Sequence, residues 1–106
     1  MEILPMVDAI ETFNSRCMLP GLNGRAREFA ERYGLAATVG SDAHTCWELG
    51  RSILLLPDFA NADDLRQVLR TGTANTRWSP PWIHLSSRYA VFRKRIRSHL
   101  DTPNAA

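Results

Sequence analysis

Asp42 and His44 are the residues of this chain whose types and spacing are best suited to chemistry. They lie two positions apart in the stretch Gly-Ser-Asp-Ala-His, which directly follows an apolar run. Residues at i and i+2 of an extended backbone point the same way, so the two side chains are expected to converge. A carboxylate and an imidazole suit a divalent ion such as Zn²⁺, Mn²⁺ or Fe²⁺, although a transition-metal site usually takes at least about three protein ligands.

The same stretch is also compatible with an ordinary polar turn. Ser41 or Asp42 can cap a following helical turn through a side-chain oxygen, and His44 would then be a polar surface residue. Such caps are common where a strand leads into a helix, so the spacing by itself favours the cap. The motif by itself does not distinguish a metal site from a cap, so the surrounding sequence is needed.

The segments around this motif alternate between strand and helix patterns. Runs of alternating or continuous apolar residues predict strands at residues 7–13, 35–39 and 52–57, and a weaker pattern predicts a short strand at 73–76. In the first strand, strict alternation places Glu11 and Phe13 on one face. Helices are predicted over residues 24–33 and after Asn61.

The ends of the predicted helices carry recognisable signals. Asn23 is available as the N-cap of the first helix, and Gly34 lies where a left-handed glycine often ends a helix. Asn61 can cap the second. Strands that alternate with helices predict a parallel α/β architecture, either a small open sheet or part of a larger barrel. Asp42 and His44 would then follow the carboxyl end of a strand, where α/β proteins place their sites.

The C-terminal segment differs in composition from the rest. We expect residues 1–77 to form one unit and residues 78–106 to comprise a Pro/Trp linker, a basic amphipathic helix over 83–100 and a frayed tail. This helix has the basic residues Arg88, Arg93, Lys94, Arg95 and Arg97 and an apolar stripe of Leu85, Tyr89, Phe92, Ile96 and Leu100. It could bind nucleic acid or an anionic surface, but the favoured expectation is that the stripe packs on the domain while the charges stay solvated.

Several sequence elements in order resemble one known family. The stretches "VDAIETFNSRC" and "NGRAREFAERYGLAATVGSDAHTCWELG", with the strand that follows, are similar to the C-terminal part of a PHP (polymerase and histidinol phosphatase) domain over residues 7–56. The resemblance implies a distorted barrel of parallel strands and helices, of the (β/α)7 type. It also implies hydrolysis of phosphate esters by metal-activated water, with Asp42 and His44 as metal ligands.

Further residues near these motifs are candidates for the site. Glu11 and Asn14 end the first strand, and each could lie at the site or support a ligand from behind. Glu48 could support a ligand or favour a helical first turn, and Arg16 could contact a substrate phosphate, although a solvated loop arginine is the favoured expectation. Cys17 and Cys46 are expected to be reduced and to fill small buried spaces.

The other metal ligands of the PHP family do not occur in this chain. A His-x-His pair and further His and Glu residues of that family would precede Met1, and His84 and His99 lie outside the matching motifs. We therefore expect a divalent metal (Mn, Zn, Fe or Mg) to bind weakly and the chain alone to be inactive. A phosphate-ester substrate would require complementing sequence, and an open barrel edge would favour self-association.

Composition places broad limits on the class of protein. The 106 residues are 44% hydrophobic and 23% charged with a formal net charge of +2, which is ordinary for a globular domain. No apolar run reaches the roughly 18 residues that a membrane span needs, and the N-terminal stretch does not resemble a signal peptide. These features predict a cytoplasmic protein.

Overall fold

The strands and helices lie close to the positions that the sequence predicts. The structure is a computed structural model that describes residues 2–100, apart from the side chain of Ser86. The elements are β1 (Ala9–Asn14), α1 (Leu22–Tyr33), β2 (Ala36–Gly40), β3 (Ser52–Leu55), α2 (Ala62–Val68), β4 (Thr73–Thr76) and α3 (Ile83–Leu100). Short 3₁₀ turns occur at Leu4–Met6, Cys46–Glu48 and Leu69–Thr71. The predicted frayed tail lies outside the described residues.

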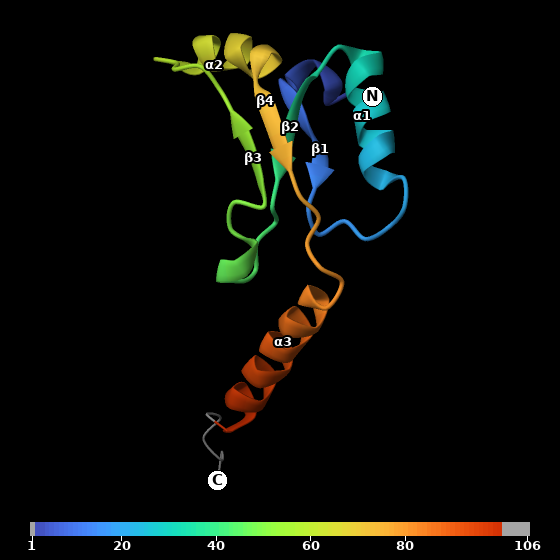
Figure 1. Cartoon of the computed structure of the whole chain (residues 1–106), viewed down its shortest axis with the longest axis vertical. Coiled ribbons are helices and arrows are strands. Elements are labelled where there is room, and N and C mark those ends of the chain that lie inside the picture. The colour runs from blue at the N-terminus through green and yellow to red at the C-terminus, as the bar shows by residue number, and fades with distance from the viewer. Residues whose placement is uncertain (1, 101–106) are drawn as a thin grey trace.

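The first two strands form a parallel pair connected by a helix. β1 and β2 pair from Ala9↔Ala36 to Asn14↔Gly40. Helix α1 connects the end of β1 to the start of β2 and lies beside β1 (Figure 1). Gly34 ends α1 with a φ of 63°, as predicted, because a residue without Cβ takes this left-handed conformation at no steric cost. Both strands therefore finish at the same edge of the sheet.

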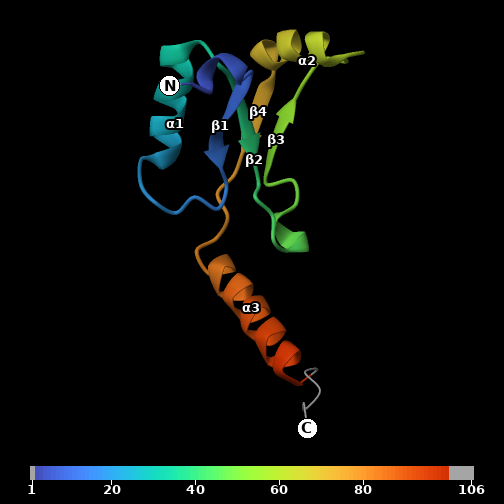
Figure 2. The same cartoon turned by 180° about the vertical axis from the view of Figure 1, so that it is seen from behind.

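The second sheet corrects the expectation of an all-parallel architecture. β3 and β4 pair in antiparallel fashion, from Ser52↔Thr76 to Leu55↔Thr73. The reason is visible in Figures 1 and 2: α2 lies across the ends of these strands instead of running back along them, so β4 starts where β3 stops. Asn61 caps α2 as predicted, since its side chain accepts a hydrogen bond of 2.9 Å from the Asp64 amide.

The two small sheets are open, and no closed barrel forms within the described residues. A buried hydrogen bond of 2.6 Å between the hydroxyl groups of Ser15 and Ser52 joins the end of β1 to the start of β3. Few apolar side chains are buried: Phe13, Ala30, Ala36 and Ile83. The ring of Phe13 meets that of Trp78 edge-on, with centroids 4.9 Å apart, which holds the segment before α3 against β1.

Helix α3 extends away from both sheets (Figure 1). The molecule measures 59 × 31 × 31 Å with a radius of gyration of 18.7 Å, whereas a compact domain of this length has about 13 Å. The expectation that the apolar stripe of α3 packs on the domain was wrong. Its five residues are 44–79% exposed, because only the first turn of the helix, at Ile83, is buried against the rest of the chain. Within the described residues, no helix is long and apolar enough to cross a bilayer.

Candidate functional site

The predicted site residues meet at the shared carboxyl edge of β1 and β2. Asn14 pairs with Gly40 in the parallel ladder, so the residues that follow Gly40 lie next to the end of β1. Glu11 and Asn14 come from β1, and Asp42 and His44 come from the loop after β2. The structure therefore brings together four residues that the sequence singled out.

A bulge at Thr12 turns Glu11 toward this edge. The ladder pairs Glu11 with Thr38 and Phe13 with Val39, which leaves Thr12 as an extra residue in β1. Glu11 and Asn14 thus pair with residues two apart on β2, and residues two apart share a face. The bulge breaks the predicted alternation: Phe13 is buried, whereas Glu11 is exposed on the side of Asn14.

Asn14 connects the two carboxylates. Its Nδ2 donates to Oε1 of Glu11 at 2.9 Å and to Oδ2 of Asp42 at 3.3 Å. Its Oδ1 accepts from the Arg16 amide at 2.9 Å, and this contact decides which end of the side chain is the donor. Asn23, expected to cap α1, instead brackets the Asn14 backbone with bonds of 3.1 and 3.2 Å, and Gly21 is the N-cap.

Gly40 leaves room for the Glu11 carboxylate. A Cβ atom added to Gly40 would lie 2.5 Å from Oε2 of Glu11, closer than any real contact allows. The carboxylate therefore rests over the bare Cα of β2. Any other residue at this position would displace Glu11 from Asn14.

Asp42 and His44 converge through a turn and not through the extended backbone that the sequence suggested. Asp42 has a φ of +51°, a left-handed conformation that aspartate adopts more easily than most residues. The turn brings Nδ1 of His44 to 2.7 Å from the Asp42 carbonyl oxygen and to 3.8 Å from Oδ1 of Asp42. An Nδ1–H that donates to this carbonyl leaves Nε2 as the free ring nitrogen, which is the tautomer that a metal ligand requires.

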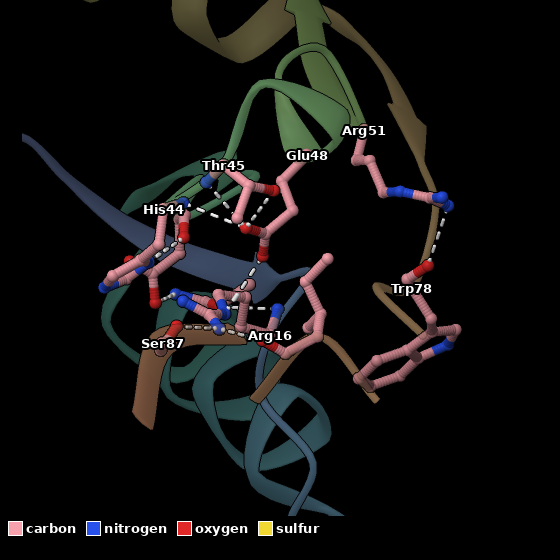
Figure 3. Close-up of polar contacts among 10 residues, drawn as sticks. Arg16, His44, Thr45, Glu48, Arg51, Trp78 and Ser87 are labelled. Atoms are coloured by element: carbon pink, nitrogen blue, oxygen red, sulfur yellow. Dashed lines mark hydrogen bonds and ion pairs between the residues drawn. The ribbon is translucent and has the colours of Figure 1, made fainter. Parts of the chain in front are cut away.

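Glu48 is fully buried directly behind this turn. Its Oε2 accepts hydrogen bonds of 3.0 Å from the His44 amide, the Thr45 amide and the Thr45 hydroxyl (Figure 3). The bond from the Thr45 amide belongs to a capping box around the turn Cys46–Glu48, so Glu48 lies in a helical first turn as one expectation had it, and its support of a metal ligand stays a prediction. Burial by itself raises the pKa of Glu48, but the hydrogen bonds from His44 and Thr45 and the charge of Arg16 together lower this pKa below its ordinary value.

Arg16 is buried beside Glu48, so the expectation of a solvated loop arginine was wrong. Its Nε lies 3.0 Å from Oε1 of Glu48, an ion pair by distance without hydrogen-bond alignment, and neither atom hydrogen-bonds elsewhere in the described chain. Its Nη2 donates to the Ile83 carbonyl at 3.2 Å and to the Ser87 hydroxyl at 2.6 Å (Figure 3). Sequence reasoning missed this burial because both partner segments are distant in the chain.

The two cysteines are free thiols, and their environments differ from the expected one. Cys17 is half-buried and Cys46 is exposed. Cys46 begins the turn whose third residue, Glu48, is buried, and its side chain remains in solvent. The expectation of a buried filler was therefore wrong for Cys46.

A shallow pocket opens over the site. It is lined by Asn14, Arg16, Cys17, Asp42, His44, His84 and Ser87. His84 comes from the first turn of α3, and its Nε2 is buried without a hydrogen-bond partner in the described residues. No pattern in the sequence indicated His84, because it reaches the pocket only through the docking of α3. Within residues 2–100, no three His, Cys, Asp or Glu side chains lie close enough to hold a metal ion.

Comparison with known proteins identifies the family. Residues 20–74, just over half of the chain, match the model of the family described as PHP-associated. The chain belongs to the PHP-associated family. This PHP-associated chain is also 45% identical over 118 aligned positions to an uncharacterized protein of Methanocaldococcus jannaschii, an alignment that covers 92% of the chain and 50% of that relative. The chain thus spans about half the length of the curated relative it matches, and no solved structure matches it.

Proposed function

We propose that this chain supplies the Asp42–His44 arm of a divalent metal site in a phosphoesterase of the PHP type. The observation that carries the proposal is the arrangement of the two side chains. Asp42 is oriented by Asn14, and His44 is held at Nδ1 with Nε2 free, as metal ligands commonly are. Both side chains are about half exposed and line the same pocket.

Asp42 and His44 would hold the ion, and Glu11 and Asn14 would support Asp42 from the end of β1. When bound, a divalent ion supplies a water of lowered pKa and neutralises charge on phosphoryl oxygens. The donors fit such an ion in type, but they are too few for a tight site. Activity on a phosphate ester therefore depends on further ligands from complementing PHP sequence.

The open architecture supports a need for complementing sequence. Among the described residues, each strand of the two two-stranded sheets pairs on one side only, and large apolar side chains such as Ile53, Leu55 and Phe59 are exposed. An open groove between α1 and the β3–β4 sheet is lined mainly by apolar and small residues. We infer that these surfaces belong to the interior of a PHP-type barrel that another segment completes. Self-association through the same edges is the competing use of these surfaces.

The metal arm is tested by titrating the chain with Mn²⁺ and following the electron paramagnetic resonance of the free ion. Weak binding is expected in the wild type, and its loss in Asp42→Asn and in His44→Gln. Asp58→Asn, at an exposed position away from the pocket, is the matched control and should bind as the wild type does. Unchanged Mn²⁺ binding in Asp42→Asn would overturn the assignment.

The phosphoesterase activity is tested by complementation. The segment of the Methanocaldococcus jannaschii relative that lies outside the alignment would be co-expressed with this chain, and hydrolysis of p-nitrophenyl phosphate measured with Mn²⁺. Turnover is expected only when both parts are present, and it should disappear in Asp42→Asn. Turnover by this chain alone would contradict its dependence on complementing sequence.

A second candidate function rests on the exposure of α3. The apolar stripe is flanked by arginines, and residues 83–100 contain no acidic residue, so the helix complements an anionic lipid surface. Vesicles with a third of phosphatidylserine should retain the chain at low salt, and neutral vesicles should not. The double substitution Arg93→Gln/Arg97→Gln should weaken the retention. Retention on a short oligonucleotide but not on vesicles would instead assign α3 to nucleic acid.

A further inference from the structure

The buried pair formed by Arg16 and Glu48 connects two parts of the molecule that otherwise have few contacts. Glu48 uses Oε2 for the backbone of His44 and Thr45, and Oε1 faces Arg16. Arg16 uses Nη2 for the start of α3, at the Ile83 carbonyl and the Ser87 hydroxyl. One continuous chain of contacts therefore runs from the backbone of His44 to helix α3 (Figure 3).

Neither charge can lose its partner without a large cost. The side chain of Arg16 is 6% exposed and that of Glu48 is 0% exposed. Removing one member of a buried pair leaves an uncompensated charge, whereas replacing both with neutral groups is often tolerated. The pair is therefore expected to move or break as a unit, together with the groups it holds on each side.

Few other contacts hold α3 in place. Ile83 is 1% exposed. The preceding segment is held by the Ser79 amide, which donates to the Ser15 carbonyl at 2.8 Å, by Nη1 of Arg51, which donates to the Trp78 carbonyl at 3.2 Å, and by the Phe13–Trp78 ring contact. Beyond Ser87 the helix is exposed up to Leu100. We therefore expect the start of α3 to dock and release locally, and release would remove both Nη2 partners of Arg16.

We propose that Arg16 and Glu48 are positioning residues that couple the docking of α3 to metal binding at Asp42 and His44. Docked α3 holds Arg16, Arg16 holds Glu48, and Glu48 fixes the backbone from which His44 projects. The coupling is reciprocal, so a bound metal also stabilises the docked helix. A partner that binds the exposed part of α3 and favours its docked position would then raise the metal affinity of the site. A partner that favours release of the helix would lower it. This inference rests on the proposed metal arm.

The first experiment releases α3 from a position that does not line the pocket. Ile83→Ala removes the buried anchor, and Ile96→Ala makes the same change on the exposed part of the helix. Mn²⁺ affinity is expected to fall roughly fivefold or more in Ile83→Ala, the usual range of such coupling, and to stay unchanged in Ile96→Ala. In the wild type, saturating Mn²⁺ should slow amide hydrogen exchange in residues 83–90. Wild-type Mn²⁺ affinity in Ile83→Ala would overturn the coupling.

The second experiment removes the connection itself. In Arg16→Met/Glu48→Gln the two charges disappear together, and circular dichroism reports whether the fold is kept. Mn²⁺ affinity is expected to be lower than in the wild type and to show no further change when Ile83→Ala is added. An undiminished effect of Ile83→Ala in this background would overturn the role of the pair. So would a His84→Ala variant that reproduces the whole effect of Ile83→Ala, because His84 would then act on the site directly.

A metal-free measurement separates this inference from the proposed function. The amide ¹H–¹⁵N resonances of His44 and Thr45 report the bonds to Glu48 without any ion. They are expected to shift in Ile83→Ala and to stay in place in Ile96→Ala. If the wild type fails to bind Mn²⁺ while these resonances shift, the metal assignment fails and the positioning role stands. If the resonances do not shift, the positioning role is wrong.

Discussion

The side-chain amide of Asn14 lies 3.3 Å from Oδ2 of Asp42 and donates a hydrogen bond to it across the parallel strand pair. The same nitrogen holds Glu11 at 2.9 Å, so one neutral amide separates and satisfies two carboxylates. Without it, the two acids would face each other with no donor between them. Hydrogen bonds from a neutral residue therefore offset the repulsion between the two carboxylates of the site.

Asn14→Asp should make the site depend on a cation. Three carboxylates would then lie together at an exposed site, and repulsion among them is expected to lower the free energy of unfolding of the metal-free chain by about 1 kcal/mol or less. Saturating Mn²⁺ should raise the melting temperature of the variant more than that of the wild type. Thermal melts with and without Mn²⁺ provide the measurement. Asn75→Asp, at an exposed position on β4, is the control; an equal response of both variants would count against the arrangement.

Gly40→Ala should disturb the site with little effect on stability. The new Cβ would push against Oε2 of Glu11, the end of a flexible side chain, so Glu11 can move at a cost of about 1 kcal/mol. The Asn14 side-chain amide resonances should shift because Nδ2 loses the Glu11 acceptor. Gly24→Ala in α1 meets no atom within 4 Å and should stabilise the helix slightly without moving these resonances. Identical Asn14 spectra in the wild type and Gly40→Ala would refute the contact.

Ser15→Ala and Ser52→Ala should be less than additive. The two hydroxyl groups share a buried hydrogen bond of 2.6 Å, so either single change leaves a buried polar group with fewer partners and should cost about 1–2 kcal/mol. The double variant removes both groups and should cost less than the sum. Urea denaturation of the four chains completes the cycle. Strict additivity would mean that the bond contributes nothing to joining the two sheets.

Protonation of Glu48 should contribute to the unfolding of the chain at acid pH. Its pKa is lowered in the folded chain, so the stability that it contributes is fully present above the ordinary glutamate pKa of 4.5 and is lost as the pH falls through the folded value. In Glu48→Gln this part of the pH dependence should disappear. The free energy of unfolding should then be lower at neutral pH and should fall less steeply as the pH is lowered. Circular dichroism at stepped pH is the measurement, with the exposed Glu28→Gln as control. A Glu48→Gln acid profile parallel to the wild type would contradict the assignment.

Local patterns in the sequence predicted the elements well, because the signals are themselves local. Gly34 and Asn61 end or begin a helix through bonds to residues a few positions away, and both predictions were confirmed. The direction of β4 was wrong because it depends on how α2 lies across the strands, which no local pattern encodes.

The candidate site was predictable where residues follow a strand end and unpredictable where they come from far away. The resemblance to the PHP family is confirmed, and Glu11, Asn14, Asp42 and His44 do meet. The ligand roles of Asp42 and His44 stay predictions, as does the supporting role of Glu11 and Asn14. The burial of Arg16 and the approach of His84 both depend on the docking of α3. The bulge at Thr12 was also missed, since a register shift depends on the partner strand.

The small number of buried apolar side chains has a calorimetric consequence. The heat capacity of unfolding scales with the apolar surface that becomes exposed, and in this chain most large apolar residues are already in contact with water. Its melting should therefore be broad, with a small heat-capacity step. If a complementing segment buries this surface, as proposed above, its association with the chain should have a large negative heat-capacity change.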